Sequence, residues 1–192
     1  MNKVQAVSGS TERAWIPLGA SSRFERIAEW ASTKIYGKVL DPLAVSFHHK
    51  GALASSLVLE ATASRWKALP TTMSTLAILA VSREIGCSWC MDFGYWEANH
   101  RGVPAEKIRG IAEWETSIVY TPLERKVIAY AVAATATPSA VTREMVDELR
   151  EELTDRQIVE LAALVSLENY RSRTNAGLGL SSQGFKDTCE IG

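Results

Sequence analysis

The sequence predicts an all-α protein with a single domain. Apolar residues recur at helical spacing along most of the chain, several segments begin with helix-capping patterns, and no segment alternates apolar and polar residues as a half-buried strand does. A chain of 192 residues, of which 46% are hydrophobic, is long enough to bury a core of ordinary size. We expect an N-terminal arm over residues 1–20, a helical bundle over residues 21–185, and a C-terminal tail over residues 186–192.

Two helices are predicted before residue 50. Ser21 or Ser22 can cap the first, which ends at Gly37. Asp41-Pro42 is typical of an N-cap followed by proline at the first helical position, so a second helix begins there. The apolar residues of the first helix share one face, and they are Phe24, Ile27, Ala28, Ala31 and Ile35.

The middle of the chain predicts three further helices. Residues 52–68 have helical spacing, and the segment after Pro70 is apolar nearly all round, as in a buried helix. Gly86 breaks or caps that helix. The next helix carries the C-x-x-C motif and runs to about Arg101, with Gly102 in the position that follows a helix C-cap.

The remaining helices are predicted from their start signals. A short helix follows Val103-Pro104, and a longer one stops before Pro138. The last helix is long and apolar, and the glycines at 177 and 179 end it. The N-caps after residue 120 are Thr121 (with Pro122 and Glu124), Thr142, and Thr154 (with Gln157). From Ser181 onward the sequence is typical of a tail.

Composition and charge argue against several functions. The formal net charge of −1 gives no electrostatic reason to bind nucleic acid or an anionic membrane. No run of about 18 apolar residues occurs, so we expect no membrane span. Residues 1–10 lack the apolar core of a signal peptide. The three cysteines do not resemble a secreted disulfide framework, so we expect the protein in the reducing cytoplasm.

The chemistry is expected at the only C-x-x-C motif, Cys87-Ser88-Trp89-Cys90. Two cysteines three residues apart on a helix lie on nearly one face, within disulfide reach. Gly86 suggests that the pair begins a helix, where unpaired backbone N–H groups and the helix dipole favour thiolate. A thiolate attacks peroxides and disulfides, and a neighbouring thiol resolves the sulfenic acid that a peroxide leaves behind.

Two other interpretations of the motif remain. It could be half of a zinc site, but no second cysteine pair exists, and the remaining Cys189 and three histidines do not have finger-like spacing. It could also consist of two inert buried thiols, because free cysteine is often buried. We expect neither a bound metal nor a cofactor, and we take Cys189 as incidental.

Proton movement at the dithiol also requires a base. Glu84, three residues before Cys87, is the best placed by helical spacing, and we consider it a proton relay, with a surface carboxylate as the alternative. We expect Asp92 to be a solvated acid in the first turn of its helix and His100 to be a cation at a helix end. The pair His48-His49 is expected at a helix end or on the surface.

The motif and its context are similar to a known family. An apolar helix, then Gly86-Cys87-x-x-Cys90, then a helix ending near Gly102-Val103-Pro104 resemble the carboxymuconolactone decarboxylase-like superfamily, and within it the alkyl hydroperoxidase D branch. The segment 167–179, LENYRSRTNAGLG, resembles the final helix of that family. The resemblance extends over about residues 43–185.

The resemblance implies an all-helical bundle of the alkyl hydroperoxidase D type that assembles into homo-oligomers. It also implies that Cys90 is the peroxidatic thiol and Cys87 its proton donor and resolving partner. The family motif places a histidine four residues after the second cysteine and a glutamate twelve before the first. Those positions hold Gly94 and Thr75 in this chain, and Glu84 is one candidate to take over the relay.

These observations give one leading function and two alternatives. The leading hypothesis is a thiol–disulfide oxidoreductase with antioxidant, peroxidase-like activity, acting on a hydroperoxide or disulfide substrate and regenerated by a thiol reductant protein. The first alternative is a non-catalytic redox sensor or interaction protein of the same fold, which the missing histidine and glutamate favour. The second is decarboxylation of a lactone acid, as the superfamily name suggests.

Overall fold

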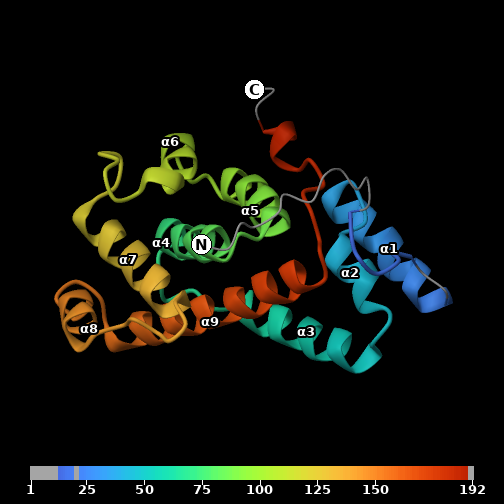
Figure 1. Cartoon of the computed structure of the whole chain (residues 1–192), viewed down its shortest axis with the longest axis horizontal. Helices are drawn as coiled ribbons and strands as arrows, with labels where there is room; N and C mark the ends of the chain where they lie inside the picture. The colour runs from blue at the N-terminus through green and yellow to red at the C-terminus, as the bar shows by residue number, and fades with distance from the viewer. Residues whose placement is uncertain (1–12, 20–21, 190–192) are drawn as a thin grey trace, which may run out of the picture.

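A computed structural model of the chain describes residues 13–19 and 22–189, and helices are the only regular elements in those ranges. Figure 1 shows their arrangement. The α-helices are α1 (Arg23–Tyr36), α2 (Asp41–Ser46), α3 (Lys50–Ala63), α4 (Thr71–Ile85), α5 (Ser88–His100), α6 (Ala105–Arg109), α7 (Pro122–Thr135), α8 (Arg143–Arg150) and α9 (Asp155–Gly177). Two short 3-10 helices, η1 (Gly110–Glu113) and η2 (Lys186–Thr188), complete the fold. The predicted all-α class is confirmed.

Helix α4 forms the centre of the molecule. It packs against α5, α7 and α9, and Figure 1 shows it enclosed by these three helices. Its apolar sequence explains this position, because a helix that is apolar nearly all round is stable only when neighbours cover every face. The fully buried aliphatic residues of α4, α7 and α9 include Leu76, Leu79, Val81, Val127, Ile128, Leu161 and Val165. Burial of each stabilises the fold by about 1.5–3 kcal/mol.

The predicted helix starts are largely confirmed. Ser22, Thr121 and Thr154 each form a complete capping box, and Gly37 ends α1 in the left-handed conformation. The start of α2 differs, because Leu40 is its N-cap and Asp41 its first residue. Among the described residues, no helix is long and apolar enough to cross a membrane.

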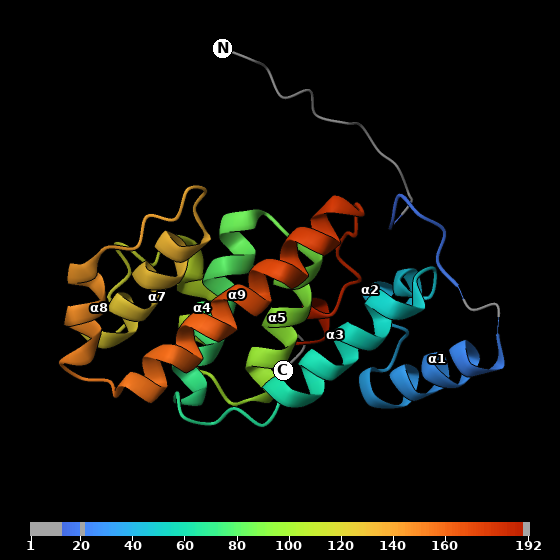
Figure 2. The same ribbon diagram turned by 90° about the horizontal axis from the view of Figure 1, so that it is seen from below.

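Helix α3 ends at Ala63, five residues earlier than expected. The backbone N–H groups of Ala68 and Leu69 donate to the carboxylate of Glu160 on α9, each at 2.9 Å. This anchor holds the segment between α3 and α4 as a connection, since amides engaged by a carboxylate on another helix do not continue a helical ladder. This connecting segment leaves α3 alongside α9, as Figure 2 shows.

Helices α4 and α5 approach very closely at Gly94. A Cβ atom added there would lie 2.9 Å from Cδ2 of Leu79, which is fully buried in α4. This is the position at which the family resemblance implies a histidine. A side chain at this position would have to displace Leu79 from its place in the packed core.

We predict that Gly94→His destabilises the protein by about 1–3 kcal/mol, because the imidazole forces Leu79 and its neighbours out of a packed core. Asn99→His, on the exposed surface of the same helix, is the matched control and should leave the melting temperature nearly unchanged. Thermal unfolding followed by circular dichroism measures both variants. Equal melting temperatures for the two would contradict the packing explanation.

Candidate functional site

The turn between α4 and α5 positions both cysteines. Gly86 adopts a φ of 77°, a left-handed conformation that glycine enters without steric cost, and it ends α4. The N–H of Cys87 then donates to the carbonyl of Ser82 at 3.0 Å, so the chain reverses within one residue. Cys87 becomes the N-cap of α5, and Cys90 lies in its first turn. The prediction that the pair begins a helix is confirmed.

The two cysteines form a disulfide with a Cα–Cα distance of 5.3 Å. Sγ of Cys87 also accepts a hydrogen bond from the backbone N–H of Cys90 at 3.2 Å. The sulfur thus takes the place of the side-chain oxygen that accepts a backbone N–H at an ordinary N-cap. A thiolate there would accept the same N–H and would be stabilised by the positive end of the helix dipole. In the reduced protein, this geometry stabilises a Cys87 thiolate.

Helix α9 supplies the second polar contact to the sulfurs. Nδ2 of Asn175 donates to Sγ of Cys90 at 3.3 Å, and both residues are buried. The sequence does not single out Asn175 as a site residue. The signal was nevertheless present, because it belongs to the segment 167–179 that resembles the last helix of the family.

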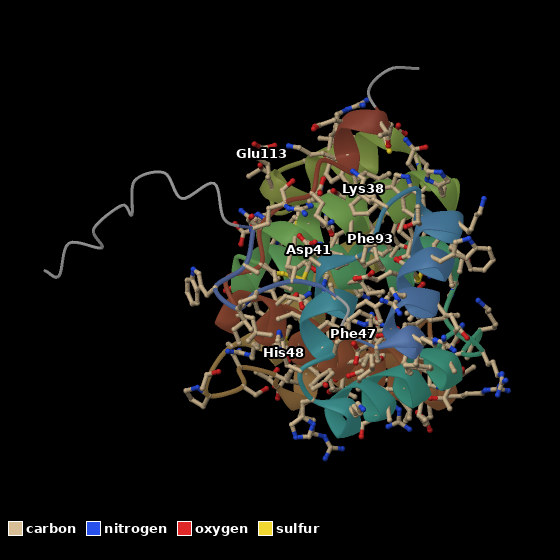
Figure 3. All side chains as sticks on the ribbon, turned by 90° about the vertical axis from the view of Figure 1, so that its right-hand side faces the viewer. Lys38, Asp41, Phe47, His48, Phe93 and Glu113 are labelled. Carbon is tan, nitrogen blue, oxygen red and sulfur yellow. A yellow bond between two sulfur atoms is a disulfide. The ribbon has the colours of Figure 1, made fainter. Side chains whose placement is uncertain are left out.

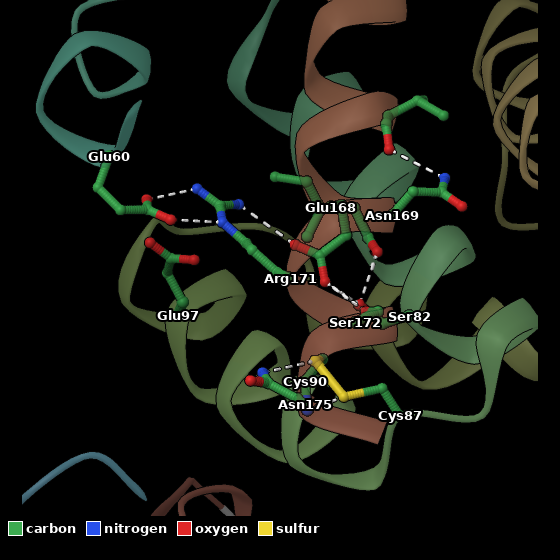
Figure 4. A network of polar contacts seen from close by, with 12 residues as sticks. Glu60, Ser82, Cys87, Cys90, Glu97, Glu168, Asn169, Arg171, Ser172 and Asn175 are labelled. Carbon is green, nitrogen blue, oxygen red and sulfur yellow. Dashed lines mark hydrogen bonds and ion pairs between the residues drawn. A yellow bond between two sulfur atoms is a disulfide. The ribbon is translucent and has the colours of Figure 1, made fainter. Parts of the chain in front are cut away.

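A buried charge network lies on the same side of α9, and Figure 4 shows it beside the disulfide. Oε1 of Glu168 accepts from the hydroxyls of Ser82 at 2.9 Å and Ser172 at 2.7 Å. Oε2 of Glu168 pairs with Arg171 at 3.2 Å, and the opposite edge of that guanidinium makes two hydrogen bonds to Glu60 on α3. Burial raises the pKa of Glu168, while Arg171 and the two hydroxyls partly oppose the rise.

A layer of apolar side chains covers the disulfide. Cys87 is 1% exposed and Cys90 6% exposed. Ala14 comes from the arm over residues 13–19, Val45 from α2, and Leu180 from the segment after α9, and all three belong to the cluster around the sulfurs. Figure 3 looks onto this covered side of the molecule. A reagent can therefore reach the sulfurs only after part of the cover moves.

Asp92 holds the C-terminal part of that cover, and its predicted role as a solvated acid is wrong. The residue is 3% exposed, and its carboxylate accepts three backbone N–H groups, from Gln183 at 2.8 Å, Phe185 at 3.0 Å and Lys186 at 2.9 Å. Burial alone would raise the pKa of Asp92, but these hydrogen bonds outweigh burial and hold the pKa below its usual value.

Residues 178–189, which we call the C-terminal strap, are anchored at further points. The side-chain oxygen of Gln183 accepts from the indole N–H of Trp89 at 2.7 Å and from the backbone N–H of Asp41 at 3.0 Å. Phe185 is 1% exposed and lies under the ammonium group of Lys38. The expectation of a tail from Ser181 onward therefore fails as far as Cys189, and residues 190–192 lie outside the described ranges.

The other residues considered from sequence lie away from the sulfurs. Glu84 is exposed near the end of α4 and makes neither of the two hydrogen bonds to the sulfurs described above, so its relay role stays a prediction. His100 ends α5, and its ring bonds to the carbonyl of Trp96. His49 is the N-cap of α3, and His48 contacts the carbonyl of Pro17, so this pair does lie at a helix start on the surface. Thr75 is buried in α4.

Comparison with known proteins supports the family resemblance. Residues 52–133 match the model of the Carboxymuconolactone decarboxylase family. This match supports the expected similarity to the carboxymuconolactone decarboxylase-like superfamily. The uncharacterized protein YnjA of Escherichia coli strain K12 is 24% identical over 174 residues, which cover 88% of this chain and 93% of YnjA.

Solved structures show the same fold. The debrominase Bmp8 superposes with a TM-score of 0.77 at 20% identity, covering 93% of this chain and 96% of Bmp8. An alkylhydroperoxidase D core, an uncharacterized peroxidase-related protein of Ralstonia eutropha JMP134, superposes with a TM-score of 0.79 at 15% identity, covering 92% of this chain and 96% of that one. The expected alkyl hydroperoxidase D-like fold is confirmed.

We predict that Asp92→Asn loosens the strap and exposes the disulfide. The variant keeps the side-chain shape but replaces three charge-assisted hydrogen bonds by weaker ones and places an amide N–H among donors. Since hydrogen bonds to charged groups contribute about 1.5–3 kcal/mol each, the rate of disulfide reduction by dithiothreitol should rise about tenfold or more. The appearance of free thiols with time measures this rate.

Asp155→Asn, which removes an exposed acid in the first turn of α9, is the control and should react like the unmodified protein. Acid should weaken the strap in the same way, and a fall in the melting temperature measures this effect, because dithiothreitol lacks the thiolate that it needs at such pH values. Because the pKa of Asp92 is lowered in the folded protein, its stabilisation is complete above the usual value of 3.8 and is lost as the pH falls through the lower folded value. A reduction rate that does not change in Asp92→Asn would contradict this role of the strap.

Proposed function

We propose that this protein is a thiol–disulfide oxidoreductase that reduces hydroperoxides through Cys87 and Cys90. The observation that carries the proposal is the placement of the pair: a disulfide at a helix start, with one sulfur accepting a backbone N–H and the other an Asn175 amide. These contacts stabilise thiolates, the reactive form of cysteine. The Carboxymuconolactone decarboxylase family match and the alkylhydroperoxidase D-like fold support an enzymatic role.

The reaction follows from the arrangement of the two thiols. The Cys90 thiolate, formed as its proton leaves, attacks the outer oxygen of the hydroperoxide, the O–O bond breaks, and the alkoxide takes a proton and leaves as the alcohol. The Cys87 thiolate then attacks the sulfenic sulfur of Cys90 and displaces hydroxide, which takes up the proton that Cys87 released and leaves as water, and the disulfide is restored. In total, two thiols and one hydroperoxide give one disulfide, one alcohol and one water.

The assignment of Cys90 as the attacking thiol rests on the family resemblance and on access. Cys90 is the more exposed of the two sulfurs, although both are covered. Each turnover then requires a reductant to reopen the disulfide, and a thiol protein or small thiol of the cytoplasm, where we expect the protein, would supply two electrons and two protons.

Burial of the sulfurs favours a second candidate function. With Cys87 and Cys90 at 1% and 6% exposure, direct access for a substrate requires movement of the strap, and the positions of the family histidine and glutamate hold Gly94 and Thr75. A non-catalytic redox sensor, in which slow oxidation changes the position of the strap, agrees with both facts. The rate in the presence of a reductant separates the two functions, because a peroxidase then consumes many equivalents of hydroperoxide quickly, whereas a sensor is oxidised only slowly after each reduction.

We predict that Cys87→Ser and Cys90→Ser each lower hydroperoxide turnover at least a hundredfold. Cys90→Ser removes the attacking sulfur, and Cys87→Ser removes the thiol that resolves the sulfenic acid. Consumption of cumene hydroperoxide with dithiothreitol as reductant measures turnover. In Cys87→Ser, but not in Cys90→Ser, one equivalent of hydroperoxide should still react and leave a sulfenic acid that a dimedone reagent labels.

Cys189→Ser is the matched control, since Cys189 is a free cysteine outside the disulfide, and it should keep full activity. Normal turnover in either Cys87→Ser or Cys90→Ser would refute the proposed reaction. Stoichiometric oxidation without turnover, at a rate too slow to sustain a peroxidase, would leave the redox sensor as the function.

We also propose that the protein forms homo-oligomers through α1 and α3. Four large apolar side chains of α1 are 63–66% exposed, and Leu57, Val58 and Leu59 of α3 are 42–63% exposed. A groove of about 310 Å³ lies between the two helices and is lined by residues of both. A second copy of the chain would cover this surface, because contiguous exposed apolar surface of this kind marks an interface. The four side chains of α1 are Phe24, Ile27, Trp30 and Ile35.

We predict that Ile27→Glu and Trp30→Glu convert the oligomer to monomer, because each places a charge in a desolvated contact. Light scattering after size-exclusion chromatography measures the mass. Ile118→Glu, at a residue that is 93% exposed outside α1 and α3, is the control and should leave the oligomer intact. A monomeric unmodified protein at micromolar concentration would refute this interface.

A further inference from the structure

Glu168 is a buried carboxylate with a network that the proposed reaction does not use. It is 3% exposed, and its partners are two hydroxyls and one guanidinium. An ion pair at the surface of the bundle would cost less free energy than this buried one, because desolvating a carboxylate costs several kcal/mol. The position of this group relative to the dithiol therefore requires an explanation.

Two connections link the Glu168 carboxylate to the residues of the disulfide. The hydroxyl of Ser82 donates to Oε1 of Glu168, while the backbone carbonyl of Ser82 accepts the N–H of Cys87. The hydroxyl of Ser172 donates to the same oxygen, and Asn175, one helical turn further along α9, donates to Sγ of Cys90. Ser82 thus links the carboxylate to the backbone of Cys87, and α9 carries both Glu168 and the Asn175 that bonds to Cys90, so the carboxylate lies on the side of the disulfide that faces α9 (Figure 4).

The groups around Glu168 leave an excess of negative charge. Arg171 on α9 is the cation of the network, and it binds both Glu168 and Glu60 of α3. Glu97 of α5 lies nearby, and both Glu97 and Glu60 act on Tyr36 of α1, whose pKa burial and these two carboxylates raise. One guanidinium therefore faces two bound carboxylates, with a third beside them, and a thiolate would add a further negative charge.

We propose that Glu168 is a positioning residue that opposes thiolate formation at Cys87 and Cys90 and so favours the disulfide over the dithiol. The proposal deepens the proposed function, because it names the group that regulates the redox equilibrium of the same site. A negative charge near a buried thiol raises the pKa of that thiol, because it destabilises the thiolate. A less stable thiolate makes the reduced protein less stable relative to the disulfide. Burial also raises the pKa of Glu168, so a proton on this carboxylate would lift the opposition.

The equilibrium concerned balances in electrons and protons. Two molecules of glutathione and the Cys87–Cys90 disulfide give glutathione disulfide and the dithiol, and the two glutathione thiols supply both electrons and both protons. Where the dithiol then releases a proton to form a thiolate, an ionised Glu168 opposes that release. Its effect on the equilibrium must therefore grow with pH and vanish where both thiols remain protonated.

The test is the glutathione equilibrium of Glu168→Gln as a function of pH, together with ultraviolet titration of the thiolate in the reduced protein. Glutamine keeps the shape and can still accept from Ser82 and Ser172 while removing the charge. Removal of one like charge should lower the thiol pKa by about one unit and shift the equilibrium about three- to eightfold toward the dithiol at about pH 9. At about pH 6, where an ordinary thiol is protonated, the shift should be absent.

Two more variants complete the design. Glu60→Gln removes an exposed carboxylate, leaves Arg171 free to neutralise Glu168, and should shift both quantities in the same direction by a smaller factor, even if Glu168→Gln fails to fold. Glu124→Gln is the matched control, because Glu124 is another buried carboxylate in an ion pair, with Lys107, and should leave the thiol pKa unchanged.

An equilibrium that does not move at about pH 9 in either Glu168→Gln or Glu60→Gln, or that moves equally at about pH 6, would overturn the proposal, since the effect would then be absent or structural. This outcome is independent of the peroxidase reaction. If no variant or unmodified protein turns over hydroperoxide but the equilibrium shifts as described, the proposed function fails and the role of Glu168 stands.

Discussion

The placement of both sulfurs depends on one local constraint, the left-handed turn at Gly86. Because the middle of α4 is buried, its direction is fixed by α5, α7 and α9, and the chain must leave it within one residue to begin α5. Glycine permits that conformation, and it makes Cys87 the N-cap of the next helix. The C-x-x-C motif therefore lies where α4 ends and α5 begins, between α9 and the strap.

Two buried carboxylates near the dithiol have opposite environments. Asp92 accepts three backbone N–H groups, so its charge is satisfied, its pKa is lowered, and it acts as an anchor that fixes the strap over the sulfurs. Glu168 depends on two hydroxyls and a shared guanidinium, and burial raises its pKa. The first controls access to the disulfide, and the second, as we propose, controls its redox equilibrium.

The sequence predicts local features better than long-range ones. The capping boxes at Ser22, Thr121 and Thr154 and the cysteines at a helix start are local patterns, and each was predictable from a few neighbouring residues. Asp92 was misjudged because its partners are residues 183–186, far along the chain. Its position in the first turn of α5 suggested solvent, and no local signal indicated the strap.

The same reason explains what the site analysis from sequence lacked. Asn175 and Glu168 become neighbours of the cysteines only when α9 packs against α4 and α5, and their residue types are common in helices of any kind. The missing histidine was visible from sequence at Gly94, but the close approach of Leu79 to this position became visible only in the packing of two helices. Exposure of the apolar face of α1 likewise became visible only once the other helices were in place.

The central claim, that the covered pair is a working dithiol, is tested most directly by titrating the fully reduced protein with an organic hydroperoxide. Free thiols and remaining hydroperoxide are measured in the same samples after an acid quench. The account predicts that one hydroperoxide disappears for every two thiols lost, and that mass spectrometry finds Cys87 joined to Cys90. Unreacted hydroperoxide, with both cysteines still reduced after prolonged incubation, would contradict it.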